Sequence, residues 1–177
     1  MSLQFRDLKA SEIDVRIGQV KPNGVVLLLY KDARCDMNIL DETVGVLNWE
    51  REHYECKGNL FCRVGINLNY DKPDALPLWV YKADCGTESN TEKEKGESSD
   101  SFKRACVNFS IGRELYSAPF IWVSSDNCTI KDKKCYDKFV VEKIKIENKQ
   151  ITGLSIINKS MGCRVFVWTK EKDGEKA

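Results

Sequence analysis

From Trp49 onward the sequence changes to a pattern in which residues of two kinds alternate. This period of two predicts a pair of strands joined by a turn at Lys57-Gly58-Asn59, where glycine can adopt a positive φ. A third strand is expected over residues 78–85. Residues 70–77 hold two of the four prolines and are expected to form an exposed loop between strands. The pattern therefore predicts an antiparallel sheet of three strands.

Helical spacing dominates elsewhere in the first half of the chain. Residues 7–17 are expected to form a short helix. Apolar residues within 33–44 recur at near-helical spacing, and Gly45 supplies a stop. Residues 25–30, VVLLLY, form a short apolar segment that is either a strand or a buried helical turn.

A longer helix is predicted after the three strands. Thr91 and Glu94 have the spacing of a capping box, which favours a helix start. Four apolar residues then occupy positions i, i+3, i+4 and i+7 and define one buried face. They are Phe102, Ala105, Cys106 and Phe109. Gly112 is expected to end the helix.

The last third of the chain returns to strand-like alternation. Residues 139–158 and 163–170 read as strands that turn at Asn148-Lys149 and at Gly162. We expect an α+β fold, in which an antiparallel β-hairpin sheet packs on a long helix as a β-β-β-α core. Residues 1–125 would form this core, and residues 126–177 a small carboxy-terminal β appendage.

Charge and hydropathy exclude several classes of protein. The chain has 28 Lys plus Arg and 27 Asp plus Glu, which gives a net charge of +1. This overall charge does not indicate any class of binding partner. Residues 126–177 are mildly basic, with 12 basic and 8 acidic residues. The longest apolar run, 25–30, is far shorter than the roughly 20 residues of a membrane helix. The amino terminus has no secretory signal pattern, so a cytoplasmic location is expected.

Neither the cysteines nor the histidine indicates a metal or catalytic site. The eight cysteines include no C-x-x-C pair, and they are expected to be free thiols that are mostly buried. His53, the only histidine, is expected to be a strand surface residue. No P-loop pattern occurs, which disfavours ATP-driven chemistry. We therefore predict no enzymatic activity, no metal and no cofactor.

Lys103 and Arg104 stand next to each other on the predicted long helix, away from its buried stripe. Phosphate contacts supply most of the sequence-independent affinity for nucleic acids, and a helix fixed by core packing would hold two such cations in place. A pair of basic residues on an exposed helical face is also compatible with a simple solvated surface.

The order of these segments resembles the Rad fifty-two-like single-strand annealing proteins, over roughly residues 30 to 115. That family has a helix ending in an F-G-x-N-G-W-like turn, a hairpin sheet, a D-x-G-x-G-like stretch and a long helix with D-x-L-K-R-A-L-R-x-F-G. The matching residues here are Gly45, Trp49, Asp84, Gly86, Asp100, Lys103, Arg104, Ala105 and Phe109. The chain also resembles the short forms carried by phages and prophages of low-GC bacteria.

The resemblance implies roles for four basic residues. Lys103 and Arg104 would contact the DNA backbone in a groove around a ring-shaped oligomer, and Arg34 is the nearest match to a contributing arginine in the preceding helix. The family's second arginine is Val107 here and its glycine is Ser110, so the helix carries fewer charges. Arg113 or the basic tail would compensate.

These observations predict ATP-independent binding of single-stranded DNA and annealing of complementary strands in recombination or repair. The expected partners are single-stranded DNA, further copies of the chain and a host single-strand-binding protein, in the bacterial cytoplasm if the gene is phage-borne. One alternative is a generic nucleic-acid-binding or protein-binding module without annealing activity. The other is a metal-dependent nuclease, for which Asp132-x-Lys134 and Glu147-x-Lys149 fit a D/E-x-K element.

Overall fold

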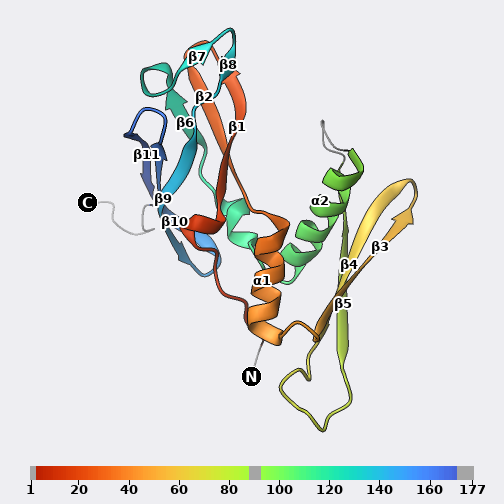
Figure 1. Ribbon diagram of the computed structural model, residues 1–177. Helices are drawn as coiled ribbons and strands as arrows, with labels where there is room; N and C mark the ends of the chain where they lie inside the picture. The colour runs from red at the N-terminus through yellow and green to blue at the C-terminus, as the bar shows by residue number, and fades with distance from the viewer. Residues whose placement is uncertain (1–2, 88–92, 171–177) are drawn as a thin grey trace. The chain divides into compact units, whose positions relative to one another are not determined.

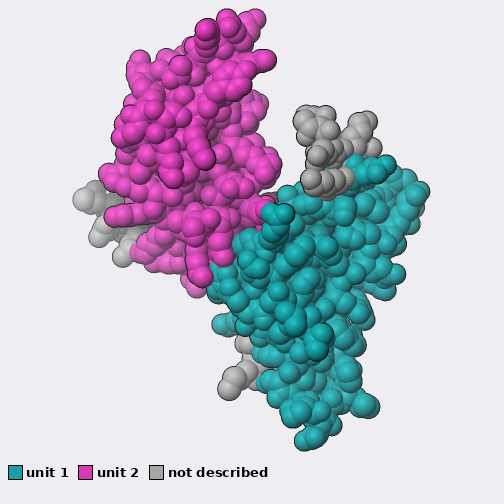
Figure 2. Space-filling model, viewed as in Figure 1, with its two compact units in different colours: residues 1–6, 33–112 teal, residues 7–32, 113–177 magenta. Residues whose placement is uncertain are grey.

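The chain divides into two units that interleave along the sequence. The computed structural model describes residues 3–87 and 93–170 (Figure 1). Unit 1 consists of residues 1–6 and 33–112, and unit 2 of residues 7–32 and 113–177 (Figure 2). Residues 7–32 and 113–125, which the sequence assigned to the amino-terminal core, therefore belong with the last third of the chain. Each unit is described by itself below.

Unit 1 is a three-stranded antiparallel sheet with two helices. Its strands are in the order β3-β4-β5, and α2 packs on β4 and β5 and also meets α1. The elements are α1 (Ala33–Val44), β3 (Trp49–Cys56), β4 (Asn59–Asn67), β5 (Trp79–Cys85) and α2 (Lys93–Asn108).

Two tight turns determine where these elements begin and end. Gly45 has φ +85° directly after α1, a conformation that glycine adopts without steric cost. Its amide donates to the Asp41 carbonyl at 3.0 Å. The β3–β4 hairpin turns through Lys57 (φ 53°) and Gly58 (φ 75°), the positive pair typical of a two-residue hairpin loop. The helix 33–44, its stop and this hairpin were all predicted correctly.

The core of unit 1 lies between α2 and the sheet. Three of the four apolar residues predicted to form the buried stripe of the helix, Phe102, Ala105 and Cys106, are fully buried. They pack with side chains from the facing side of the central strand, which are Cys62, Val64 and Ile66. The helix ends at Asn108, four residues before Gly112. Thr91, the first residue of the predicted capping box, lies outside the described residues.

Unit 2 is built around a six-stranded sheet in the order β11-β10-β9-β1-β2-β6. The two edge strands, β11 and β6, approach each other, so the sheet curls toward a barrel. Its strands are β1 (Asp14–Lys21), β2 (Gly24–Tyr30), β6 (Ile121–Ser124), β9 (Phe139–Glu147), β10 (Gln150–Asn158) and β11 (Cys163–Thr169). A small hairpin of β7 (Ile130–Lys131) and β8 (Lys134–Cys135) and the short 3-10 helices η1 (Ala10–Glu12), η2 (Arg113–Ser117) and η3 (Ser125–Asn127) complete it.

A buried carboxylate ties the start of unit 2 to its second stretch. Glu114 is fully buried in η2, and its Oε1 accepts the backbone N–H of Leu8 at 2.8 Å. Its Oε2 has no hydrogen-bond partner within the described residues. One charged side chain therefore satisfies a buried backbone donor far away in the sequence.

The predicted α+β class, with a hairpin sheet on a long helix and a small β appendage, is wrong. The described residues form eleven strands and two α-helices of 12 and 16 residues, so the protein is mostly β. The supposed appendage is half of the six-stranded sheet, because β9 pairs with β1 through Asp14 and Val140. Residues 7–17 are not a helix: η1 covers three of them, and β1 begins at Asp14. Local periodicity cannot report such distant pairing.

Candidate nucleic-acid interface

Lys103 and Arg104 lie on α2, beside the buried stripe that fixes this helix to the sheet. Their side chains are 22% and 41% exposed, so both are partly covered. The backbone that carries them is held by neighbours that are fully buried, Phe102 and Ala105. The helix therefore presents the two cations from a rigid base, as the sequence predicted.

Carboxylates partly neutralise this pair. The Arg104 guanidinium donates from Nε and Nη2 to Asp84 Oδ1 on β5, at 3.3 Å in each case. Lys103 Nζ lies 4.0 Å from Asp100 Oδ1, one helical turn earlier. A phosphate would have to compete with these carboxylates for the two cations.

After β5 the chain passes unusually close to the backbone of α2 at Gly86. A Cβ at this position would lie 2.2 Å from the Glu97 carbonyl oxygen and 2.9 Å from the Ser101 nitrogen, so only glycine fits. The next residue, Thr87, donates from both its backbone N–H and its hydroxyl to Asp100 Oδ2. The segment Asp84 to Thr87 is thus locked onto the helix that carries the basic pair.

Trp49 connects the end of α1 to the same helix. Its indole Nε1 donates to Asp41 Oδ1 at 2.6 Å, and its ring centroid lies 6.1 Å from that of Phe102. Gly45 makes the turn that brings Trp49 to this place. Trp49, Asp84 and Gly86, three of the residues that carried the family resemblance, therefore all contact α2 although they are distant from it in sequence.

Two further cations on the sheet flank α2, and the sequence analysis missed both. The Arg51 guanidinium lies 4.9 Å from the centre of the Phe102 ring. Lys82 Nζ donates to the Asn108 carbonyl at 2.6 Å and lies 4.9 Å from the centre of the Phe109 ring. Strand alternation puts Trp49, Arg51 and His53 on one face, which is the signal that could have identified Arg51.

The other two predicted contact residues lie on other elements than the basic pair. Arg34 is exposed in the first turn of α1, within unit 1. Arg113 is exposed in η2, which belongs to unit 2. Ser110, which replaces the family's glycine, has φ 71°, so this position does require the left-handed conformation that glycine favours.

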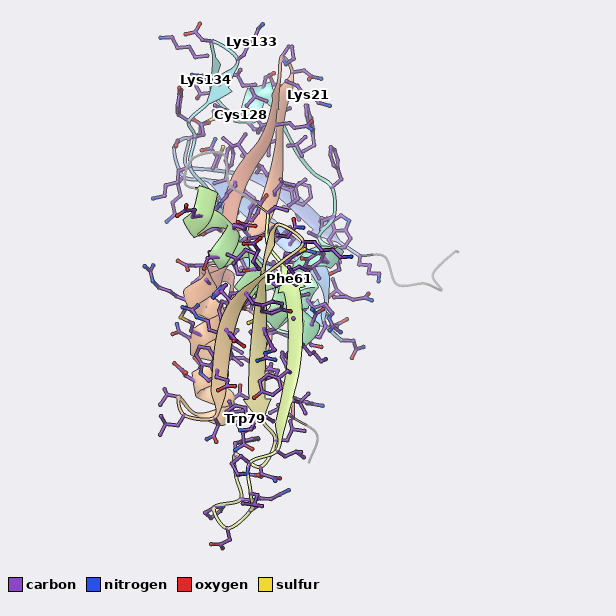
Figure 3. The ribbon with its side chains drawn as sticks, turned by 90° about the vertical axis from the view of Figure 1, so that its right-hand side faces the viewer. Lys21, Phe61, Trp79, Cys128, Lys133 and Lys134 are labelled. Atoms are coloured by element: carbon purple, nitrogen blue, oxygen red, sulfur yellow. The ribbon has the colours of Figure 1, made fainter. Side chains whose placement is uncertain are left out.

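The sheet face opposite α2 carries aromatic side chains. Tyr54 and Phe61 stack with centroids 5.6 Å apart, and Trp79 and Tyr81 with centroids 6.3 Å apart. By register Phe61 and Trp79 lie at opposite ends of this face, as the labels in Figure 3 also show. The Arg63 guanidinium lies 4.9 Å from the Tyr81 ring centre, between the two pairs along the strand register.

Acidic residues share this aromatic face. Glu52 pairs with Arg63, and Glu50 Oε1 accepts the Tyr81 hydroxyl at 2.9 Å. The hydrogen bond to the Glu50 carboxylate raises the pKa of Tyr81. The face therefore offers rings for stacking but has one cation against two carboxylates, which makes it a poor primary site for a phosphate backbone.

The histidine and the cysteines behave as structural residues. His53 is half-buried on β3 and bonds through Nε2 to the carbonyl oxygen of Ser98 at 3.1 Å. All eight cysteines are free, and four are buried. Those four are Cys35, Cys62, Cys106 and Cys128. The expectation of free thiols is confirmed, but the expectation that most of them are buried is not, because only half are.

The nuclease motifs do not converge on a site. Asp132 and Lys134 lie on the exposed β7–β8 hairpin. Glu147 ends β9, and Lys149 lies in the β9–β10 turn, where it pairs with Asp7 at 2.8 Å. Among residues 3–87 and 93–170, no group of three or more His, Cys, Asp or Glu side chains is placed to hold a metal ion. The geometry gives no support to a D/E-x-K centre.

Comparison with known proteins adds no relative. No family model, no curated protein and no solved structure matches this chain. Within the described part of the chain, no helix combines the length and the apolar character that crossing a bilayer requires.

Proposed function

We propose that this protein binds single-stranded DNA and promotes the annealing of complementary strands without ATP. The main support for this proposal is the set of contacts around α2. Asp84, Gly86 and Asp100 fix the position of this helix, which carries Lys103 and Arg104. These residues also carry the resemblance to single-strand annealing proteins. Their contacts with one another keep the two basic residues in fixed positions, as a phosphate-binding element requires.

The basic pair would act on the sugar-phosphate backbone. Phosphates would exchange with the Asp84 and Asp100 carboxylates, and Arg51 and Lys82 would add positive charge beside them. Contacts to phosphate leave the base edges outward and available for pairing with a second strand. Annealing then follows from the raised local concentration of complementary strands, and we assign no catalytic step.

Self-association belongs to the same proposal. Residues 119–123, PFIWV, are an apolar segment that could supply a contact surface between copies of the chain. Ile121 and Val123 are buried within β6, and Phe120, 72% exposed, is the most exposed apolar side chain of this segment. Tyr116, 70% exposed, lies close to it in sequence. We propose a homo-oligomer and a host single-strand-binding protein as partners.

An annealing assay with the full chain tests the proposal. Complementary fluorescent oligonucleotides should anneal faster than spontaneously with EDTA present and ATP absent. Lys103→Gln should weaken single-strand binding, and the slope of log affinity against log salt should become shallower by about 0.7, the value for one single-strand phosphate contact. Lys72→Gln, at an exposed lysine of the same unit, is the charge-matched control.

The alternatives give different results in the same assay. If strands bind but anneal no faster than without protein, a generic binding module is correct. Shortened strands together with a need for Mg²⁺ would indicate a nuclease. A species of about 20 kDa in light scattering, with and without DNA, would remove the oligomer from the proposal.

A further inference from the structure

One end of unit 2 carries four lysines from two hairpins. Lys21 stands at the tip of the β1–β2 hairpin, and Lys131, Lys133 and Lys134 belong to the β7–β8 hairpin. Figure 3 shows Lys21, Lys133 and Lys134 at this same end, and β8 also contacts β1. We call these four residues the lysine tip. All four are exposed.

The charges of the lysine tip are not compensated locally. Some other basic side chains of unit 2 do pair with carboxylates, as Lys145 does with Glu147, Lys149 with Asp7 and Arg164 with Glu142. No ion pair joins a tip lysine to a carboxylate in the part of the chain that the structure describes, although Asp132 lies in the same turn. Uncompensated positive charge on a surface attracts a polyanion.

A polar network fixes the base of the β7–β8 hairpin. Asp137 Oδ2 accepts the Thr129 backbone N–H at 2.8 Å and the amide of Asn158 at 2.7 Å. Asn158 is fully buried at the end of β10 and also donates to the Asn127 carbonyl at 3.0 Å. Buried Cys128 closes the base through a contact with the Ser124 carbonyl. The short hairpin is therefore anchored to the large sheet.

The turn itself holds Lys133 in an unusual backbone conformation. Asp132 and Lys133 have φ of 50° and 59°, the positive pair of a two-residue hairpin loop, although neither is glycine. Lysine is not favoured in this region, where asparagine and glycine are common. The backbone conformation at position 133 therefore does not explain why a lysine is found there.

We propose that the lysine tip is a second contact surface for the phosphate backbone of single-stranded DNA. The inference rests on the proposed function and adds to it a site in unit 2. Cations presented from two anchored hairpins suit an extended chain of phosphates better than a single compact anion. Tyr136, 80% exposed directly after β8, supplies a ring on which a base can stack.

A double variant at the tip, compared with a matched control, tests this surface. Lys133→Asn combined with Lys134→Gln removes two charges, and asparagine tolerates the positive φ at 133. The control is Lys57→Asn with Lys72→Gln, because Lys57 occupies a hairpin turn with the same kind of backbone (φ 53°). The probe is a fluorescent oligothymidine titrated over a series of salt concentrations.

The tip variant should show a salt slope shallower by about 1.4, corresponding to two single-strand phosphate contacts, and the control should keep the wild-type slope. If the wild-type protein binds the oligothymidine and the tip variant keeps the wild-type salt slope, the lysine tip is not a contact surface, while the proposed function is unaffected. If the salt slope becomes shallower in the tip variant but not in Lys103→Gln, the lysine tip is supported and the assignment of DNA contact to Lys103 on α2 is wrong.

Two further outcomes decide against the tip. If the wild-type protein binds no oligothymidine, both the tip and the proposed function fail. If the tip variant loses binding to polyglutamate while its binding to oligothymidine is unchanged, the surface serves an acidic protein and the proposal is overturned. Circular dichroism of both double variants confirms that each is folded.

Discussion

Arg104 on α2 and Asp84 on β5 form an ion pair in which Nε and Nη2 both lie 3.3 Å from one carboxylate oxygen. The pair holds the guanidinium at the junction of helix and sheet. It also means that the arginine proposed to bind phosphate already has an anionic partner. Asp84 therefore sets both the position and the availability of Arg104.

Replacement of Asp84 by asparagine separates these two effects. Asp84→Asn should increase affinity for single-stranded DNA, because phosphate no longer competes with a carboxylate for Arg104. The loss of stability should be small, within about 1 kcal/mol, since the pair is partly exposed. Fluorescence anisotropy and urea unfolding measure the two quantities. Weaker DNA binding by a stable variant would show that Asp84 mainly positions the arginine.

The contact at Gly86 predicts a large effect from adding one methyl group. Gly86→Ala should destabilise unit 1 by about 1–3 kcal/mol, because the new Cβ meets backbone atoms of α2 and the helix must shift. Gly153→Ala is the control, since its Cβ would meet Lys145 Cβ at 3.3 Å, a milder contact. Urea unfolding compares them. Equal stability of the two variants would refute the close packing at Gly86.

Two substitutions of Glu114 should differ in their effect on stability. Glu114→Ala should cost about 1–3 kcal/mol, because the buried Leu8 N–H loses its acceptor. Glu114→Gln keeps an acceptor oxygen for this N–H, so it should lose much less stability than the alanine variant. Thermal unfolding tests both. A Gln variant as unstable as the Ala variant would mean that the carboxyl group itself is needed.

Alkaline pH should weaken the fold through a buried thiol. Burial raises the pKa of Cys62 from 9.0 to about 11, an effect that the nearby Arg51 charge partly opposes. A pKa that is higher in the folded state stabilises the protein below the unfolded value, and this contribution is lost as pH rises from about 9 toward 11. Urea unfolding at several pH values should show this decline.

Cysteine variants identify the thiol responsible. Cys62→Ala should flatten the decline in part, because the pKa of buried Cys128 is also raised to about 11 and its contribution remains. Cys56→Ala removes an exposed thiol and should leave the decline unchanged. The assignment to Cys62 fails if both variants follow the wild-type curve.

The sequence predicted those features that depend on neighbouring residues. Helix 33–44 was correct because apolar spacing and Gly45 define it locally, and the turns at Lys57-Gly58 and Asn148-Lys149 were correct for the same reason. Residues 7–17 were misassigned, although Ile13, Val15 and Ile17 do alternate with polar residues. Their strand is stabilised by β2 and β9, and the pairing with β9 involves residues far away in the sequence.

The candidate site shows the same limit. The sequence placed Lys103 and Arg104 on a helix fixed by Phe102, and the structure has them there. It identified Asp84 only as part of a motif, because a carboxylate on a strand and an arginine on a later helix become partners through tertiary packing. The lysine tip was hidden for a related reason, since Lys21 meets the β7–β8 hairpin through the fold alone.

The insertion of residues 33–112 between the two stretches of unit 2 has a consequence for synthesis on the ribosome. The β1–β2 hairpin is translated early, but β6 and β9, which cover its two edges, follow only after all of unit 1. Unit 1 can fold during translation, while both edges of the β1–β2 hairpin remain unpaired until β6 and β9 are synthesised. During this interval the nascent chain is exposed to strand pairing with a neighbouring chain, so translation speed and chaperone access should affect the yield of folded protein.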